Sequence, residues 1–203
     1  LLDLAAMEAA GPCLLVGFSD VTALHTVFGD RLGVATLHAP GVAGLGELDD
    51  PSRERVRECV VGAAPSVLRG RWLVSAEAEV SGPLVGGNLA LLASAAGTPD
   101  AGRALAAVAL LEDVAEPPYR VDRMVTQLLR SGWFDGVRAV VCGDFTRCGD
   151  PAEVEAVLRA RLGGVAPVLV GLPVGHGPVN EPILLGARAR LTPDGTLHVA
   201  GLR

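Results

Sequence analysis

The chain of 203 residues contains no lysine, so all 17 of its basic residues are arginine. The acidic residues outnumber them and give a formal net charge of −6. Proteins that bind nucleic acid present a dense basic surface, and no block of arginines stands out here. The charge therefore argues against a nucleic-acid partner. We attribute the missing lysine to compositional bias and infer no function from it.

Cysteine is scarce and scattered, at Cys13, Cys59, Cys142 and Cys148, with no Cys-x-x-Cys pair. Disulfide frameworks and structural zinc sites need closer and more regular spacing. We therefore expect buried free thiols, no metal and no cofactor, and a reducing, cytoplasmic compartment. Cys142 and Cys148 are near enough in sequence to reach each other, but buried thiols are the simpler interpretation.

Aromatic residues make up 3% of the chain although half of its residues are hydrophobic. The apolar content is therefore mainly alanine, valine and leucine, which favours layered strands and helices over an aromatic-cored sandwich. No apolar run approaches the roughly 18 residues of a membrane-spanning helix, so we expect no membrane partner.

Residues 11–25 combine a short apolar run with a glycine, a serine and a helical pattern. Cys13 to Val16 is typical of a strand buried on both faces, and Gly17 permits a sharp turn. Either Ser19 or Asp20 then caps a helix that starts at Val21. Alternatively, Ser19 sits on a strand-to-helix turn with the geometry of a nucleophile elbow, where the next backbone N–H helps to hold an oxyanion.

The start of the chain, Leu-Leu-Asp-Leu, has no initiator methionine and no signal-peptide pattern. A strand that is buried on both faces also needs more neighbours than the following residues supply. We therefore expect this sequence to be the C-terminal part of a longer protein, or one product of a cleaved one.

Three regions follow from the composition: residues 1–48, a linker helix at 49–66, and residues 67–203, where strands and turns alternate. Within them the sequence predicts helices at 2–10, 21–28, 51–62, 89–96, about 121–129 and 151–162. It predicts strands at 13–16, 34–37, 71–80, 106–111, 137–142 and 168–170, a turn at 81–89, and a hairpin of 183–190 with 196–202.

Three polar residues stand where predicted strands end: Ser19, Glu112 and His176. Ligands collect at the carboxyl ends of strands in layered α/β proteins. A serine nucleophile needs a base, and the base needs a carboxylate that orients it. His176 lies between two glycines in a proline-rich loop, and a functional and a structural role explain it equally well. Glu112, Asp113 and Glu116 either have a functional role or serve as helix caps or as partners of nearby arginines. The other histidines are interpreted structurally: His25 is either packed or half-exposed in its helix, His38 binds the backbone and His198 lies at the surface.

Four blocks of the sequence carry a family resemblance: Gly-Phe-Ser-Asp-Val-Thr-Ala-Leu-His, Gly-Pro-Leu-Val-Gly-Gly-Asn-Leu, Leu-Glu-Asp-Val-Ala-Glu-Pro-Pro-Tyr-Arg-Val-Asp-Arg-Met and Leu-Pro-Val-Gly-His-Gly. In this order they resemble the LD-carboxypeptidase family of serine peptidases, which includes the microcin C7 immunity peptidases. The resemblance implies a triad of Ser19, Glu112 and His176, with the Asp20 N–H as one oxyanion donor. It also implies an α/β fold, here a remnant of a flavodoxin-like N-terminal domain followed by a β/β/α C-terminal domain.

The family's Arg-Gly-Gly-Tyr-Gly-like segment, which supplies the second oxyanion donor, has no match in this sequence. We therefore expect the 203 residues to be inactive unless the missing part is supplied, within the same chain or as a separate one. The resemblance implies a murein tetrapeptide substrate that loses its terminal D-alanine in peptidoglycan recycling, and a homodimer. The alternatives are a microcin-immunity-type peptidase that cleaves peptidyl- or aminoacyl-nucleotides, and a non-catalytic module that binds a small ligand.

Overall fold

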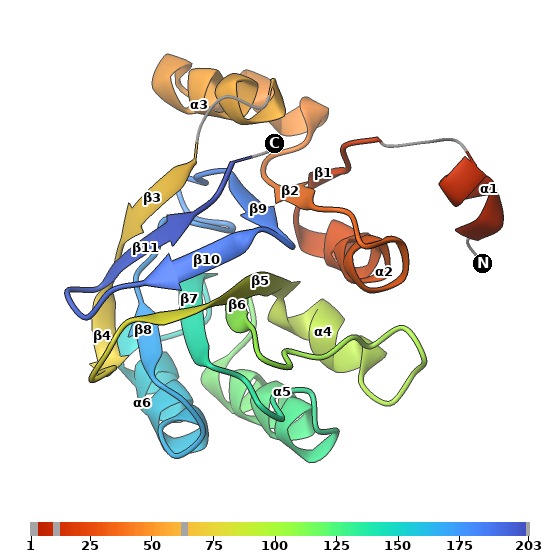
Figure 1. Ribbon diagram of the computed structural model, residues 1–203. Coiled ribbons are helices and arrows are strands. Elements are labelled where there is room, and N and C mark those ends of the chain that lie inside the picture. Colours follow the sequence, from red (N-terminus) through yellow and green to blue (C-terminus); the bar gives the residue numbers. More distant parts are fainter. Residues whose placement is uncertain (1–3, 10–12, 62–64, 202–203) are drawn as a thin grey trace.

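The structure is a computed structural model, and it describes residues 4–9, 13–61 and 65–201 (Figure 1). Its helices are α1 (Leu4–Ala9), α2 (Thr22–Leu32), α3 (Asp50–Val60), α4 (Leu89–Ala95), α5 (Pro118–Arg130) and α6 (Pro151–Leu162). Its strands are β1 (Val16–Gly17), β2 (Thr36–His38), β3 (Ser66–Arg69), β4 (Arg71–Val74), β5 (Val80–Asn88), β6 (Val108–Val114), β7 (Ala139–Thr146), β8 (Val168–Val170), β9 (Ile183–Leu185), β10 (Arg188–Leu191) and β11 (Thr196–Val199). Short 3-10 turns span Ser19–Val21 and Val42–Glu47.

An eight-stranded mixed sheet forms the centre of the molecule, in the order β3-β11-β10-β5-β6-β7-β8-β4. Strands β5 to β8 run parallel, and helices α4, α5 and α6 connect them in turn. β3 and β4 lie at the two ends of this order but are joined by Gly70, whose N–H donates to Gly195 O at 2.9 Å. The sheet therefore curls until its two ends nearly meet, which gives a mixed α/β fold with an almost closed sheet.

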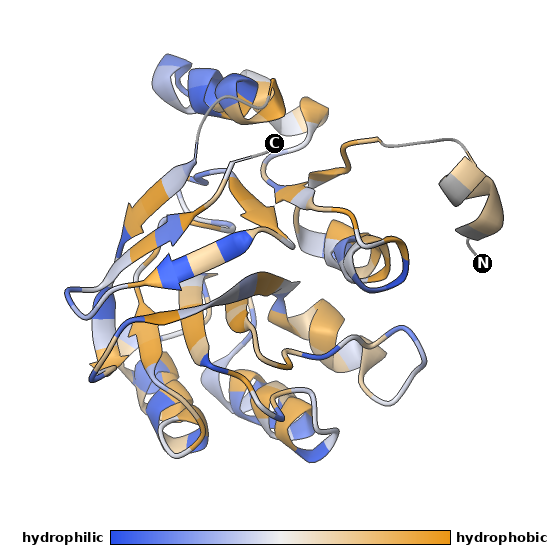
Figure 2. Ribbon diagram, viewed as in Figure 1, coloured by the Kyte–Doolittle hydropathy of each residue, from blue (hydrophilic) through white to orange (hydrophobic). Residues whose placement is uncertain are grey.

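Two apolar cores lie on the two faces of this sheet. Helices α4, α5 and α6 cover the outer face (Figure 1), with Leu111, Val125 and Leu158 among the residues they bury. The inner face encloses Leu110, Leu169 and other residues of the second core. Figure 2 shows β6, β7 and β8 as largely hydrophobic, as expected for parallel strands that are covered on both faces.

A separate three-stranded sheet has the order β1-β2-β9. β1 and β2 come from the N-terminal part of the chain, and β9 comes from residues 183–185, where it pairs antiparallel with β2. The C-terminal part of the chain thus completes the small sheet whose first strand precedes Ser19. The division into residues 1–48, 49–66 and 67–203 stays a prediction.

Several predicted elements agree with the structure. The helix at 151–162 and the strand at 168–170 match α6 and β8, and the exposed helix after residue 50 matches α3, in which only Val56 and Cys59 are buried. Figure 2 shows α3 as mostly hydrophilic. Cys59, Cys142 and Cys148 are buried free thiols, as predicted, while Cys13 is exposed.

Three predicted strands are wrong. The first is not buried on both faces: β1 covers only Val16–Gly17 at the edge of the small sheet, and Leu14, Leu15 and Val16 are half-buried. The strand predicted at 71–80 stops at Val74, where the chain bends. The predicted hairpin begins only at β10, because Ile183–Leu185 pairs with β2 instead.

The predicted turn at 81–89 is in fact β5, a central strand. Its glycines misled the prediction because glycine usually weakens a strand. Here Gly86 has φ +118, and a Cβ atom on it would overlap Leu110 O of the neighbouring strand. The glycines permit close approach of two backbones instead of breaking the strand.

Candidate active site

Ser19 lies on a strained turn between β1 and α2. Its φ is +58, in a region that non-glycine residues adopt at a cost of about 1–3 kcal/mol. Gly17 permits the tight turn, since a Cβ atom there would lie 2.7 Å from Val21 Cγ2. Neither the 3-10 turn nor α2 has a side-chain N-cap, so the prediction that Ser19 or Asp20 caps the helix is wrong. The backbone strain is what the elbow interpretation requires.

Glu112 and His176 form the closest charged pair of the site. His176 Nδ1 lies 2.7 Å from Glu112 Oε2, with the Glu112 side chain fully buried and the His176 side chain 17% exposed. Glu112 lies inside β6 and not after it, as the sequence had suggested, at an irregularity where the β6–β7 register shifts between Leu111 and Asp113. The carboxylate faces the loop that carries His176.

The two pKa values move in opposite directions. Burial raises the pKa of Glu112, but its interactions with His176 and with His38 outweigh burial, so that this pKa lies below its ordinary value. The hydrogen bond to Glu112 raises the pKa of His176, although burial and the charge of Arg147 oppose the shift. The pair therefore favours an ionised carboxylate beside an imidazole that readily accepts a proton.

The loop of His176 is fixed by a glycine and an asparagine. The Gly175 N–H donates to the buried Asn180 Oδ1 at 3.0 Å. Gly175 has φ +117, and a Cβ atom on it would lie 2.5 Å from Glu112 Oε2. Only glycine therefore lets this loop approach the carboxylate closely enough for the Glu112–His176 bond.

The turn that carries Ser19 contacts the same imidazole. The Phe18 and His176 rings have their centroids 4.7 Å apart, so the residue before the serine packs against the candidate base. Among the residues that the structure describes, neither the Ser19 hydroxyl nor His176 Nε2 has a hydrogen-bond partner. The Ser19–His176 bond and the role of the Asp20 N–H therefore stay predictions.

A polar network that the sequence analysis missed anchors the helix after Ser19. The buried Thr22 Oγ1 accepts from the Asn88 N–H at 2.9 Å, and Asn88 Nδ2 donates to Asp113 Oδ1 at 3.1 Å. Asp113 also accepts from the Ala90 N–H of α4, and burial raises its pKa to about 6. The sequence around Thr22 does not indicate this role. The glycines of Gly86-Gly87-Asn88 could have indicated a close contact, because a Cβ atom on Gly87 would lie 2.7 Å from Thr22 Oγ1.

The remaining candidate residues lie outside the contacts between Ser19, Glu112 and His176, apart from His38. His25 is buried, which is one of its two predicted arrangements, with its Nδ1 2.8 Å from Thr36 Oγ1 and its Nε2 3.0 Å from Gly17 O. Glu116 pairs with Arg120 at 3.2 Å. His198 is half-buried on β11. The prediction for His38 is wrong, because its side chain makes no hydrogen bond to the backbone of the described residues; it is fully buried beside Glu112.

Features of other kinds of site do not involve Ser19, Glu112 or His176. In the described ranges, no group of three or more His, Cys, Asp or Glu side chains is arranged to hold a metal ion. A cavity of about 280 Å³ lies between α2, β5 and the segment before β6, and neither Ser19, Glu112 nor His176 lines it. No helix within the described part of the chain is long and apolar enough to cross a bilayer.

The fold and this site define an α/β protein in which a strained serine and a carboxylate–imidazole pair lie at the carboxyl ends of parallel strands. Family models match it in two places: the LD-carboxypeptidase C-terminal domain at residues 81–191 and the LD-carboxypeptidase N-terminal domain at residues 1–39. The chain belongs to the LD-carboxypeptidase family.

Individual relatives agree with this assignment. A Streptomyces coelicolor protein, provisionally named a carboxypeptidase, is 43% identical over 206 residues, covering 97% of this chain and 65% of its own length. The murein tetrapeptide carboxypeptidase of Pseudomonas aeruginosa is 35% identical, covering 94% of this chain and 66% of its own length. The chain thus spans about two thirds of the length of these relatives.

Solved structures share the fold. Muramoyltetrapeptide carboxypeptidase from Oxalobacter formigenes superposes with a TM-score of 0.80 at 29% identity, covering all of this chain and 73% of its own. The microcin C7 self-immunity protein, in complex with glutamyl sulfamoyl guanosine, gives a TM-score of 0.80 at 21% identity over 98% of this chain and 70% of its own. The second likeness concerns the fold alone.

Proposed function

We propose that the intact protein is a serine carboxypeptidase that removes the terminal D-alanine from murein tetrapeptide. The observation that carries the proposal is the 2.7 Å contact between Glu112 and His176, with the strained Ser19 turn packed against the same imidazole through Phe18. The names of the relatives from Pseudomonas aeruginosa and Oxalobacter formigenes support the substrate class.

In the proposed reaction, Ser19 Oγ attacks the carbonyl carbon before the terminal residue and gives its proton to His176 Nε2. Glu112 holds His176 in the tautomer that bears hydrogen on Nδ1 and stabilises the imidazolium that forms. The Asp20 N–H supports the oxyanion. The C–N bond then breaks as His176 protonates the leaving amine, and water, with His176 again as the base, hydrolyses the ester on Ser19.

An active-site label tests the nucleophile directly. A serine-directed phosphonate should modify Ser19 of the intact protein, as located by peptide mass spectrometry, and the modification should vanish in Ser19→Ala and His176→Gln. Ser94→Ala is the matched control, because that serine is exposed on α4 and bonds only its own helix at Leu91 O. Labelling that persists in Ser19→Ala would refute the assignment.

The substrate is tested by release of D-alanine from murein tetrapeptide, measured beside cleavage of an aminoacyl-nucleotide. The nucleotide reaction requires an aromatic platform for the base. Trp133 does not supply one, since it is 3% exposed and its Nε1 donates to Ala101 O at 3.1 Å. We expect murein peptide to be preferred, and preference for the nucleotide conjugate would identify a microcin-immunity-type peptidase.

A non-catalytic binding module is the alternative from another class. Such a protein would bind murein peptide equally well in its wild-type and Ser19→Ala forms and would release no D-alanine. We also expect the 203 residues alone to be at least about 10²-fold slower than the intact protein, because losing one oxyanion donor typically costs 10²–10³ in rate. Equal turnover by the 203-residue chain would contradict this. The cytoplasmic location and the homodimer stay predictions.

A further inference from the structure

A second histidine, His38, faces the other oxygen of the Glu112 carboxylate. Its Nε2 lies 3.9 Å from Glu112 Oε1, while His176 Nδ1 lies 2.7 Å from Oε2. Each oxygen of the carboxylate therefore faces its own imidazole. The His38 and Glu112 side chains are both fully buried.

The polar atoms between His38 and Glu112 have no other partner. Within the described residues, His38 Nδ1, His38 Nε2 and Glu112 Oε1 are buried without a hydrogen bond. Nearly all buried polar atoms in folded proteins are paired. Glu112 Oε1 and His38 Nε2 are also complementary, since a carboxylate oxygen only accepts and an imidazole nitrogen can donate.

The position of His38 is set by the small sheet. His38 is the last residue of β2 and is in register with Gly17 of β1 and Ile183 of β9. The Phe18 ring lies edge-on to it, with centroids 6.1 Å apart, and the His25 ring is equally distant on the α2 side. The titratable groups that face it are thus Glu112 from β6 and His25 from α2, with His176 beyond the carboxylate.

We propose that His38 is a positioning residue for the Glu112–His176 pair, donating from Nε2 to Glu112 Oε1 and holding the carboxylate ionised and oriented. This inference rests on the proposed function. A hydrogen bond requires a separation of about 2.7–3.2 Å, so the two groups approach by about 1 Å when it forms. The base would then be oriented through a chain of three side chains, His38–Glu112–His176, and the serine would be activated only when all three are in line.

The proposal is tested with two substitutions that differ in their ability to donate. His38→Gln keeps an amide nitrogen near the Nε2 position, whereas His38→Leu keeps the bulk and removes the donor. In the intact protein we expect His38→Leu to lower kcat/KM on murein tetrapeptide by about tenfold to a hundredfold, the range for a hydrogen bond to a charged group. His38→Gln should recover most of this loss.

The pH profile separates positioning from a merely structural role. Without the donor the carboxylate is less stabilised, and it interacts more strongly with His176. Both effects move the acid limb of kcat/KM to higher pH in His38→Leu, and His38→Gln should move it back. A structural defect would lower the amount of active protein without moving the limb. The proposal would be overturned if His38→Leu left both kcat/KM and the position of its acid limb unchanged. It would also be overturned if the acid limb moved equally in His38→Leu and His38→Gln.

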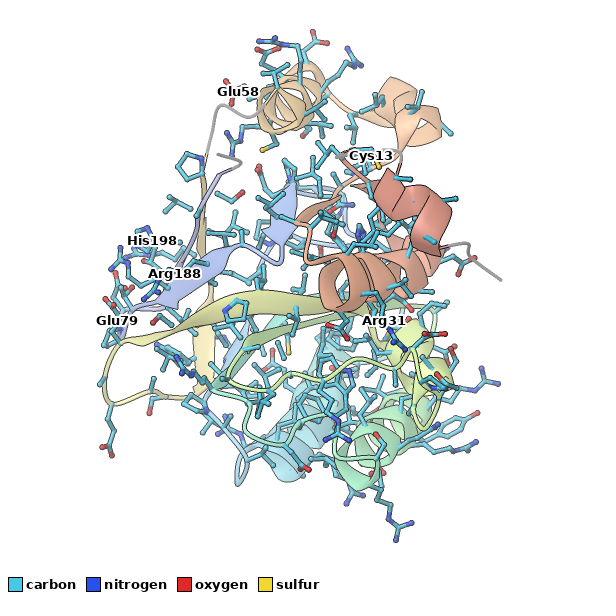
Figure 3. The ribbon with its side chains drawn as sticks, turned by 45° about the vertical axis from the view of Figure 1, so that its right-hand side comes forward. Cys13, Arg31, Glu58, Glu79, Arg188 and His198 are labelled. Carbon is cyan, nitrogen blue, oxygen red and sulfur yellow. The ribbon has the colours of Figure 1, made fainter. Side chains whose placement is uncertain are left out.

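Two controls keep the test decisive. His198→Gln makes the same substitution on β11, at the edge of the molecule with Arg188 and Glu79 (Figure 3), and should change neither quantity. If His38→Leu does not fold, His38→Asn replaces it, because its amide is too short to reach Glu112. If the wild-type protein releases no D-alanine, the proposed function fails; the titration of His176, followed by NMR, still tests His38 and should move to higher pH in His38→Leu.

Discussion

The part of the site that carries Glu112 and His176 differs from the part that carries Ser19. Glu112 lies in a seven-residue central strand whose side chains are almost all buried, and its pair with His176 is already formed. Ser19 follows a two-residue edge strand, has a strained backbone and makes no side-chain hydrogen bond to the described residues. The acid–base pair is thus built into one core, whereas the nucleophile is held from outside that core.

Several contacts connect the Ser19 part to the rest, including the exposed ion pair of Arg31 with Asp100. β9 pairs with β2, Thr22 accepts from the Asn88 N–H, and Phe18 packs on His176. Each contact joins residues that are distant in the sequence. The difference suggests that substitutions near Glu112 chiefly disturb the chemistry, while those near Ser19 also disturb how the two parts fit together.

The largest effect is expected from removing the reacting groups. Ser19→Ala should lower kcat on murein tetrapeptide by at least about 10⁴-fold, and Glu112→Gln by roughly 10⁴-fold because the wrong tautomer of His176 is favoured. Steady-state assays of the intact protein measure both. Ser19→Ala should leave the free energy of unfolding within about 0.5 kcal/mol, since alanine and serine are similarly disfavoured at positive φ; a much larger loss would mean that Ser19 has a structural role.

Acid should destabilise the Ser19 part through His25. Burial lowers the pKa of His25 to about 4 from 6.5, helped by the charge of His38 and opposed by the Gly17 carbonyl. The unfolded chain therefore binds more protons between these pH values, so stability is lost as pH falls from 6.5 toward 4. The loss from this residue should reach about 3 kcal/mol.

Urea unfolding between pH 7 and 4.5 measures the slope of the free energy of unfolding against pH. His25→Gln, which does not titrate, should flatten it, and His198→Gln should leave it as in the wild type. His176 has the opposite dependence: its raised pKa adds stability that is lost only as pH rises through that pKa. A slope that His25→Gln does not change would contradict the assignment to His25.

Gly175→Ala should displace the loop of His176 from Glu112. The added Cβ atom would lie 2.5 Å from Glu112 Oε2, in addition to the cost of a positive φ. Gly171→Ala is the matched control, since Gly171 has φ +81 but open space around its Cβ position. Both variants should lose about 1 kcal/mol of stability from strain, and Gly175→Ala should lose a further 1–3 kcal/mol and most of its activity. Thermal unfolding and D-alanine release measure the difference, and equal effects would show that close approach to Glu112 is unimportant.

The smallest effect is expected at Thr22. Thr22→Val keeps the shape and leaves the buried Asn88 N–H without an acceptor, which should cost about 1–2 kcal/mol. Thr26→Val, one helical turn further, removes only a 3.2 Å bond to Thr22 O in its own helix and should cost less. Equal free energies of unfolding, from urea titration, would remove the Thr22–Asn88 bond from the contacts that join the two parts.

The sequence predicted the elements with clear periodicity. α6 and β8 were predicted because apolar residues recur at helical spacing in one and form a short continuous run in the other. β5 was not, because the glycines that normally mark a turn serve there to bring two backbones together. The pairing of β9 with β2 was also missed, since a three-residue apolar segment carries no record of a partner strand that lies at the other end of the chain.

Within the site, the residue types and motifs of the sequence were enough to single out Ser19, Glu112 and His176, and the family resemblance gave them roles. The roles of His38 and Thr22 were not predictable in the same way. A buried histidine without a partner, or a threonine that accepts from a distant strand, is defined by what surrounds it and not by its neighbours in sequence.

The sequence by itself determined the family, the periodic helices and strands, and the glycine-flanked loop that carries the imidazole, because these depend on local patterns of residue type. Only the tertiary structure decided that Glu112 lies between two histidines and that Ser19 sits on a strained turn without capping its helix. These features depend on the register of β6 and β7 and on the small sheet that β9 completes. Burial and separations of a few ångströms arise from such long-range pairing, which no local stretch of sequence encodes.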